Sequence, residues 1–409
     1  MATVAACNRF ACRYTALPFG GGRAGIRFGK QGMAVQVCVA KETRAGERRV
    51  ALAPDAVKRL LGKGMRVGVQ AGAGEPAGFA DALFGEAEIV ADAGALLGKA
   101  DISLIVNPPD AAQIALLREG SALIGFLDPH SGLDRFAALA ARKISAFSVE
   151  LIPRISRAQA MDALSSQASI AGYKAVLLGA GHLGKFFPML TTAAGTIRPS
   201  KVLVIGAGVA GLQAIATARR LGAVVEGYDV RAAVKEQVES LGAKFVDTQV
   251  AAEGSGGYAR ELTEAEQAKQ REILAKHIAG ADVIVTTAAI PGRPSPRIIG
   301  AELVAEMRGG SVIIDLAAEG GGNCELTRAG EVVNHGGIII DGPINLPGQM
   351  GAHGSELYSK NLLALLDLLV GDGEINIDLE DEIINDSLVT HAGAIHNAGI
   401  RERLRAAQD

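Results

Sequence analysis

A glycine-rich turn between two apolar runs is the part of this sequence that points most directly to chemistry. It lies in KVLVIGAGVAGLQAIATARRLGAVVEGYD, residues 201–229. The first glycine of its GxGxxG pattern permits a tight turn, the second lets the backbone approach a pyrophosphate, and the third lets the next helix pack against the strand. The start of that helix offers N–H groups and a positive dipole to phosphates. The pattern predicts a dinucleotide site rather than a turn without function, and its expected contacts are Gly206, Ala207, Gly208, Val209, Ala210 and Gly211.

An acidic residue, Asp229, ends the second apolar run at the spacing that such sites require, about 20 residues after the glycines. Its carboxylate can accept hydrogen bonds from both hydroxyls of an adenosine ribose. A 2′-phosphate would place negative charge against that carboxylate, so the sequence favours NAD(H) over NADP(H). The next two residues, Val230 and Arg231, are expected to line the same site.

A second GxGxxG pattern, Gly179 to Gly184, lies just upstream and does not predict a nucleotide site. It follows a segment, residues 158–174, that is typical of a helix rather than a strand. Pro188 interrupts the helix that should come next, and no acid follows at the right distance. We therefore expect a flexible or closely packed turn here.

Composition limits the class of protein. The chain has 409 residues, enough for two domains, and its 52 glycines, 49% apolar and 4% aromatic residues are typical of an α/β protein with covered sheets. A net charge of −3 gives no basic surface for nucleic acid. No apolar stretch reaches the roughly 18 residues of a membrane span. No metal site or disulfide framework is expected, because no CxxC pairs occur among Cys7, Cys12, Cys38 and Cys324.

Strand-like and helix-like runs alternate along the chain and predict two Rossmann-like α/β domains with parallel sheets. In the first domain we expect strands at Val35–Ala40, Arg66–Gln70, Ile102–Val106, Leu123–Phe126 and Ile144–Ser148, and a helix at Pro54–Lys63. In the second we expect strands near 202–205, 224–228, 283–287, 311–315 and 338–340. Two further helices are expected at Ala158–Val176 and Leu357–Val370.

The helix at Leu357–Val370 has no strand left to pair with, so it should return to the first domain and make that domain discontinuous. The expected domains are residues 33–164 with 352–409, and residues 165–351, with the NAD site in the cleft between them. Residues 1–32 contain no Asp or Glu and are expected to be a disordered leader or a misassigned start, with a targeting peptide as the alternative.

Three other segments are expected at the nucleotide site. Asp247–Thr263 has no periodicity and places Tyr258 among glycines, which predicts a mobile lid, with a solvated insertion as the alternative. The segments Ala288–Pro291 and Leu316–Glu319 follow strands, at the edge where α/β sheets bind ligands. Their expected contacts are Ala288, Ala289, Ala317 and Glu319, with Asn323 and Glu325 as further candidates.

Three stretches resemble a known family. Residues 38–64, CVAKETRAGERRVALAPDAVKRLLGKG, are similar to the opening of the alanine dehydrogenase and proton-translocating transhydrogenase superfamily. Residues 153–167, PRISRAQAMDALSSQ, resemble the nicotinamide-side loop of the transhydrogenases, and residues 186–199, FFPMLTTAAGTIRP, are equally characteristic of them. The resemblance covers Val35 to Leu369 and implies the NAD(H)-binding domain I component, of the alpha-1 type without membrane spans.

Departures from the alanine dehydrogenases favour the transhydrogenase side. Those enzymes hold their keto acid with an arginine, a lysine and a histidine. Arg49 matches the arginine, but Ile105 and Asp128 stand at the other two positions, although His130 is close in sequence. Without a cation and a proton donor, reductive amination has no acid/base machinery. Gln349 stands where transhydrogenases often carry an arginine.

The resemblance implies hydride transfer from NADH, bound by this chain, to NADP⁺ bound on a partner subunit, because only one credible dinucleotide pattern is present. Membrane-spanning subunits would couple the transfer to proton translocation. It also implies a homodimer in the cytoplasm, peripheral on the cytoplasmic face of the inner membrane through those partners. Two rival hypotheses are an NAD-dependent alanine dehydrogenase and a non-catalytic NAD-sensing module.

Residue roles at the nicotinamide are also implied by the resemblance. Arg154 would bind the carboxamide or a phosphate, and Gln159 would bridge the nicotinamide ribose or the partner's nucleotide. Asp162 would orient Arg154, and Ser165 would reach the carboxamide. Without the motif, Arg154, Arg157 and Asp162 are typical of a surface ion-pair cluster.

Overall fold

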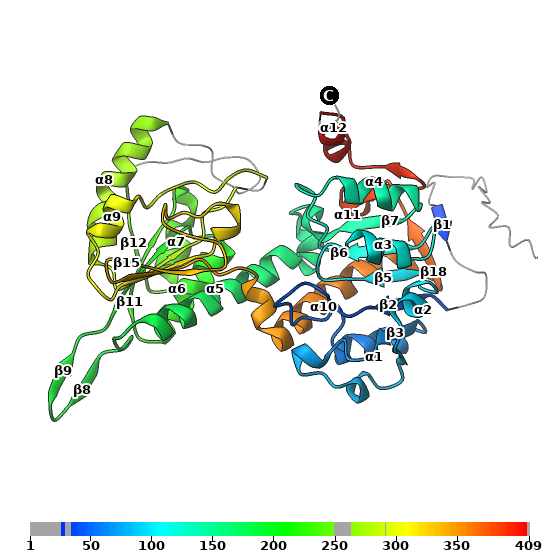
Figure 1. Cartoon of the computed structure of the whole chain (residues 1–409), viewed down its shortest axis with the longest axis horizontal. Coiled ribbons are helices and arrows are strands. Elements are labelled where there is room, and N and C mark those ends of the chain that lie inside the picture. Colours follow the sequence, from blue (N-terminus) through cyan, green and yellow to red (C-terminus); the bar gives the residue numbers. More distant parts are fainter. Residues whose placement is uncertain (1–25, 29–33, 249–262, 291, 407–409) are drawn as a thin grey trace, which may run out of the picture.

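The computed structural model describes residues 26–28, 34–248, 263–290 and 292–406. Within them the chain forms two α/β units, which helical segments α5 (Ala163–His182) and α10 (Gly351–Leu369) connect (Figure 1). The prediction of two Rossmann-like domains with parallel sheets is confirmed. Residues 249–262, with Tyr258 and the expected lid, lie outside the described residues, as do Pro291, residues 1–25 and residues 29–33.

The first unit is built on an eight-stranded sheet in the order β20-β19-β7-β6-β5-β2-β3-β4. Strands β2 to β7 are parallel to their neighbours, and β19 and β20 add an antiparallel edge. The strands are β2 (Gln36–Val39), β3 (Arg66–Gln70), β4 (Glu88–Val90), β5 (Ile102–Leu104), β6 (Ala122–Gly125), β7 (Ser145–Ser148), β19 (Leu388–His391) and β20 (Ala394–Ile395). The helices around them are α1 (Pro54–Gly62), α2 (Ala93–Leu97), α3 (Ala111–Leu116), α4 (Asp134–Ala141), α11 (Glu382–Ser387) and α12 (Ala398–Ala406).

Helix α10 packs against this first sheet. Its Tyr358 and Leu362 belong to the same hydrophobic core as Val37 and Val39 of β2. Its serines also bind backbone there, since Val50 N donates to Ser355 Oγ at 2.9 Å. After it, β17 (Val370–Gly371) and β18 (Glu374–Ile377) pair with each other, and β18 pairs with β1 (Ile26–Phe28). These short strands, and β4, β19 and β20, were not predicted from the sequence.

The second unit is built on a seven-stranded sheet in the order β12-β11-β10-β13-β14-β16-β15, in which only β15 is antiparallel within the described residues. The strands are β10 (Lys201–Ile205), β11 (Val224–Tyr228), β12 (Lys244–Phe245), β13 (Val283–Thr286), β14 (Val312–Asp315), β15 (Val332–His335) and β16 (Ile338–Asp341). Helices α6 (Val209–Arg220), α7 (Lys235–Ser240), α8 (Glu264–Gly280) and α9 (Ala301–Ala305) surround it. Two separate apolar cores line its two faces, which explains why the strands read as continuous apolar runs.

Helix α5 begins and ends later than the sequence suggested. The expected helix at 158–176 is instead a 3₁₀ segment, η4 (Ser156–Met161), followed by α5 from Ala163 to His182. Asp162 leaves the helical conformation and caps α5, because its Oδ1 accepts the Ser165 N–H at 2.8 Å.

The prediction of a turn at Gly179 to Gly184 was wrong, because Gly179 and Gly181 lie inside α5. Close packing explains one of these glycines. A Cβ on Gly179 would lie 2.8 Å from Val283 Cγ1 of β13. Another helical glycine, Gly172, has a similar cause, since its Cβ would lie 2.0 Å from the Ala210 carbonyl oxygen in the first turn of α6.

A two-stranded hairpin projects from the second unit, at the lower left of Figure 1. It consists of β8 (Leu190–Thr192) and β9 (Gly195–Ile197), paired antiparallel. Apolar side chains on and beside it face solvent, with Met189 65% and Ile197 47% exposed. No helix among the described residues combines the length and apolar character needed to cross a membrane.

Candidate dinucleotide site

The three glycines after β10 each have a distinct structural cause. Gly206 has a positive φ of 95°, and a Cβ there would lie 2.5 Å from Thr287 Oγ1. Gly211 packs on the same turn, since its Cβ would lie 1.8 Å from the Gly206 carbonyl oxygen. Gly208 has ordinary extended backbone, and no described atom lies within 4 Å of the position its Cβ would take. Only Gly208 therefore borders open space, as a pyrophosphate path requires.

The start of α6 supports the same assignment. Gly208 is its N-cap residue, and within the described part of the chain no side chain caps the first turn. Val209 is exposed, and Ala210 carries only a methyl group. The N–H groups and the positive end of the helix dipole are thus left for an anion.

Asp229 lies beside this turn, but its carboxylate is not free. Its Oδ2 accepts the Ala207 N–H at 2.7 Å and Arg231 Nη2 at 2.8 Å. Its Oδ1 accepts the Arg231 N–H and Nε, both at 2.9 Å. The sequence placed Asp229 and Arg231 at one site but did not reveal this ion pair. Val230, between them, packs against the apolar core on one face of the sheet.

The loops after β13 and β14 are held together by Asn323, which is fully buried. Its Nδ2 donates to the carbonyl oxygens of Ala288 and Pro296, both at 2.8 Å, and its Oδ1 accepts the Ala288 N–H at 3.0 Å. Ala289 follows in the same loop. Asn323 therefore fixes the backbone that the sequence assigned to the cofactor. Glu325 instead accepts the Ala301 N–H at the start of α9.

Asp315, at the end of β14, lies at the same edge of the sheet and was not among the residues predicted from the sequence. It is fully buried, and its Oδ1 accepts Thr286 Oγ1 at 2.8 Å and the Ala317 N–H at 3.0 Å. Its Oδ2 accepts the Asn323 N–H at 2.8 Å, the Cys324 N–H at 3.0 Å and Thr327 Oγ1 at 2.7 Å. The sequence feature that could have indicated it is an acidic residue at the end of the apolar run VIID, residues 312–315. Five donors explain how this charge is tolerated without solvent.

Contacts near the ends of their strands join the two units. Arg44 Nη2 of the first unit binds Glu319 Oε1 of the second at 3.0 Å. A Cβ on Gly292 would lie 2.9 Å from His130 Nδ1, so these segments also touch. The edge that carries Ala317 and Glu319 therefore faces the first unit, where a shared site was expected.

The residues expected at the nicotinamide lie just before η4, on η4, and at the N-cap and start of α5. Arg154 and Gln159 are exposed, and Asp162 and Ser165 are half-buried. The Asp162 carboxylate binds both the N–H and the hydroxyl of Ser165, at 2.8 and 2.6 Å. Arg157 forms a two-bond ion pair with Asp381, at 2.6 and 3.0 Å. The assigned nicotinamide contacts stay predictions.

Comparison with known proteins decides the family. Two protein-family models match the chain. The model described as "Alanine dehydrogenase/PNT, N-terminal domain" matches residues 38–171, and the model described as "Alanine dehydrogenase/PNT, C-terminal domain" matches residues 175–398. The chain belongs to the alanine dehydrogenase/PNT family. This confirms the superfamily that the sequence motifs indicated.

Within the alanine dehydrogenase/PNT family the chain is more similar to transhydrogenases. It is 46% identical to the first part of the NAD(P) transhydrogenase alpha subunit of Rhodospirillum rubrum, over 88% of this chain and 97% of that protein. The crystal structure of transhydrogenase from Sinorhizobium meliloti matches with a TM-score of 0.80 and 44% identity, over 88% of this chain and 99% of that one. The alanine dehydrogenase of Mycobacterium tuberculosis is 31% identical, over 72% of this chain and 75% of that protein.

Arg49, which matches the keto-acid arginine of alanine dehydrogenases, is buried in a network of its own in this family member. Its Nε and Nη2 bind the two carboxylate oxygens of Glu47 at 2.8 and 2.7 Å. Its Nη1 donates to Gln167 Oε1 at 2.9 Å, and Nη2 also donates to Asn345 Oδ1 at 3.1 Å. Although burial acts to raise it, the Arg49 guanidinium lowers the pKa of Glu47 to about 2. The charge of Arg49 is therefore already neutralised.

The two positions that match the lysine and the histidine of alanine dehydrogenases hold no residue that could replace them. Ile105 is apolar, and Asp128 has a positive φ of 48°. The Asp128 N–H donates to Glu150 Oε1 at 2.8 Å. Neither residue supplies a cation.

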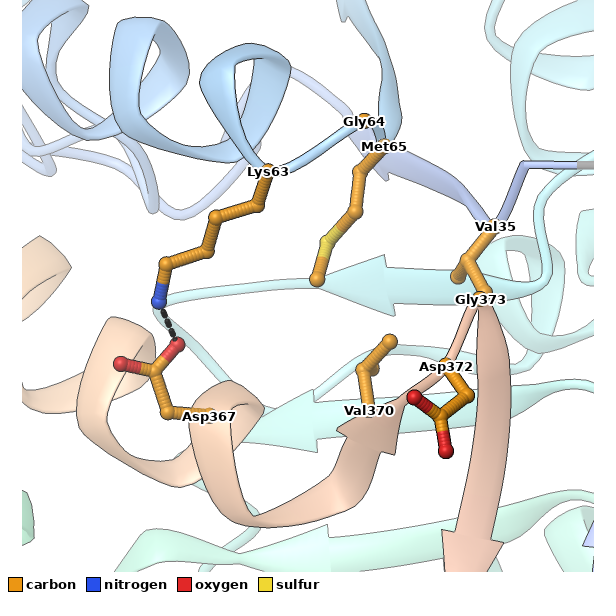
Figure 2. Close-up of a pocket in the computed structure, with 8 residues that line it drawn as sticks. All are labelled: Val35, Lys63, Gly64, Met65, Asp367, Val370, Asp372 and Gly373. Atoms are coloured by element: carbon orange, nitrogen blue, oxygen red, sulfur yellow. Dashed lines mark hydrogen bonds and ion pairs between the residues drawn. The ribbon is translucent and has the colours of Figure 1, made fainter.

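A pocket of about 290 Å³ lies elsewhere, in the first unit (Figure 2). Val35, Met65 and the Lys63–Asp367 ion pair line it, together with the turn at Asp372. Val35 and Met65 precede β2 and β3, so the pocket lies at the amino ends of those strands. Because parallel sheets bind ligands at the carboxyl ends, we do not assign the nucleotide to it.

Proposed function

We propose that this chain is the NAD(H)-binding component of a proton-translocating NAD(P)⁺ transhydrogenase. Hydride passes from NADH held by this chain to NADP⁺ held by a partner subunit, and membrane-spanning subunits couple the transfer to proton translocation. The observation that carries the proposal is the match to the R. rubrum transhydrogenase alpha-subunit polypeptide along 97% of its length. The glycine turn at Gly206–Gly211 and the uncapped start of α6 support it.

The chemistry demands positioning rather than acid–base catalysis from this chain. A hydride moves between two nicotinamide rings, so the nucleotides supply the reacting atoms. The protein holds the pyrophosphate at α6, holds the adenosine ribose at Asp229, and fixes the nicotinamide with Arg154, Gln159 and Ser165. The Asn323 and Asp315 bonds keep the loops after β13 and β14 in one conformation, which limits the motion of a ring bound against them.

An alanine dehydrogenase is disfavoured by the surroundings of Arg49. A keto-acid carboxylate would have to compete with Glu47, which already binds Arg49 through two charge-assisted hydrogen bonds. Ile105 and Asp128 provide neither a second cation nor a proton donor suited to the carbonyl.

The experiment that tests the function mixes this chain with a separately prepared NADP(H)-binding transhydrogenase subunit. Reduction of an NAD analogue by NADPH is followed by absorbance. Binding of NADH without transfer beside any such partner would favour the NAD-sensing module.

Gln159→Asn and Arg154→Ala are each expected to lower the hydride-transfer rate far more than the affinity for NADH. Both side chains are proposed to align the ring, and a misplacement of about 1 Å can cost about 100-fold in rate. Transfer rates with the partner and NADH titrations of the same variants make the comparison. Equal losses in rate and affinity would make these residues simple binding contacts. Arg157→Ala, which removes the neighbouring arginine that binds Asp381, is the matched control.

We also propose that two copies of this chain form a homodimer, located in the cytoplasm and peripheral to the inner membrane through the partner subunits. The β8–β9 hairpin supports a second copy as occupant, because it presents Met189, Ile197 and the neighbouring Phe186 to solvent on a projecting ribbon. An isolated two-stranded ribbon is marginally stable without packing, so a covering surface is expected.

Met189→Glu combined with Ile197→Glu is expected to convert the dimer to monomers, measured by sedimentation velocity. Each charge would have to be buried at the interface, which is strongly unfavourable. Leu83→Glu is the control, since Leu83 is a comparably exposed apolar residue (56%) on the first unit. A dimer that survives the double substitution would place the interface elsewhere.

A further inference from the structure

We propose that Arg231 sets the selectivity of the site between NAD(H) and NADP(H), by acting as the resident counter-ion of Asp229. The inference rests on the proposed function and concerns the adenosine end of the same site. It changes the role of Asp229, whose charge alone was expected to reject a 2′-phosphate.

The hydrogen bonds of Asp229 carry the argument. A carboxylate offers about four acceptor positions in its plane. Here four donors occupy them, two on each oxygen: the Arg231 N–H and Nε on Oδ1, and the Ala207 N–H and Arg231 Nη2 on Oδ2. Side-chain exposure is 6% for Asp229 and 22% for Arg231, so the pair is largely shielded from solvent. Ribose hydroxyls cannot simply be added to this carboxylate.

The guanidinium must therefore give way when a ribose binds. Two of the four bonds come from backbone N–H groups, which belong to the glycine turn and to the segment after β11 and stay in place. The other two come from the guanidinium, one on each oxygen. Their removal opens one acceptor position on each oxygen, and a ribose diol has one hydroxyl for each. The Arg231 side chain thus stands where the diol of NADH would bind.

The displaced guanidinium has opposite effects on the two dinucleotides. For NADH, two charge-assisted bonds are exchanged for bonds from neutral hydroxyls, so Arg231 opposes binding. NADPH brings a 2′-phosphate with a charge of about −1.5 to −2 to the same place. A guanidinium within hydrogen-bonding distance of Asp229 can turn onto that phosphate and offset its repulsion from the carboxylate. Both effects narrow the preference for NAD(H).

Arg231→Gln is therefore expected to widen the preference, measured as the ratio of the NADPH and NADH dissociation constants. We expect NADH to bind at least as tightly as it does to the natural chain, and NADPH to bind at least about tenfold more weakly. Arg231→Lys keeps the charge but loses the two-bond geometry. Its ratio of dissociation constants should therefore lie between those of the natural chain and of Arg231→Gln. Fluorescence titrations of the full chain with NADH and with NADPH give both constants, and thermal melting checks that each variant is folded.

The ratio separates this inference from other roles of Arg231. If Arg231→Gln weakened NADH and NADPH by the same factor, the residue would be a general contact or a structural support, and the inference would be overturned. Tighter NADPH binding to the variant would also overturn it. If the natural chain bound no NADH at all, the proposed function itself would fail, and that result would be visible before any variant is compared.

Discussion

Gly208→Val is expected to weaken NADH binding severely while the protein remains folded. No described atom lies within 4 Å of the position of a Cβ at Gly208, and its backbone suits any residue. The side chain therefore meets no protein atom there and instead fills the proposed pyrophosphate path. Affinity should fall by at least about 100-fold, and melting by only a few degrees, since a poor N-cap residue costs about 1 kcal/mol. Calorimetric titration with NADH and a thermal melt give the two results.

Gly211→Ala provides the matched control at the same turn. Its Cβ would lie 1.8 Å from the Gly206 carbonyl oxygen and 2.8 Å from the carbon, a clash with backbone that cannot be relieved by a side-chain rotation. This smaller substitution should prevent correct folding of the second unit. Unchanged NADH affinity in Gly208→Val would contradict the assignment of the pyrophosphate to this turn.

The chain by itself is expected to bind NADH and to transfer no hydride, and transfer should begin when the NADP(H)-binding subunit is added. One dinucleotide turn cannot hold two nicotinamides, and the Arg49 region lacks the cation and the proton donor that a keto acid needs to accept hydride from NADH. We expect the transfer rate to rise from background by at least about 100-fold, because holding two reactants together removes most of the cost of bringing them into contact. Reduction of an NAD analogue by NADPH, with and without the partner, measures this rise.

An assay with pyruvate and ammonia can contradict this second prediction. Steady NADH oxidation by these two compounds, with no partner present, would contradict the transhydrogenase proposal and favour an alanine dehydrogenase. Binding of NADH with neither hydride transfer to the partner's nucleotide nor oxidation by pyruvate and ammonia would favour the sensing module.

The parts of the fold that the sequence predicted well are those with local causes. Apolar runs gave the central strands of both sheets, and Gly206 could be placed because only glycine readily adopts a positive φ at a tight turn. Helix boundaries depended on less visible causes. Asp162 reads as part of a helical run, yet its side chain caps α5. Gly179 reads as a turn residue, yet it lies in α5 because β13 packs close to it.

Local motifs also pointed to Asp229 and the glycine turn, whose contacts with a dinucleotide stay predictions. The Arg231 pair could not be predicted, because it depends on how two side chains are oriented. Asp315 and Asn323 act through backbone groups of distant loops, which no local pattern marks. The hydrogen bonds of Arg49 could not be predicted either, because Gln167 and Asn345 are distant from it in the sequence and become neighbours only in the folded chain.

The contact between Gly172 and Ala210 would make α5 a spacer of fixed length between the proposed nicotinamide and pyrophosphate positions of one dinucleotide. Asp162 and Ser165, proposed on the nicotinamide side, lie at its start, and Gly172 touches the first turn of α6, where the pyrophosphate is proposed to bind. Ten residues of helix span about 15 Å, and one inserted residue would turn everything before it by about 100° and shift it by about 1.5 Å. Insertions and deletions should therefore be tolerated in the surface loops of related chains and excluded between positions 162 and 172.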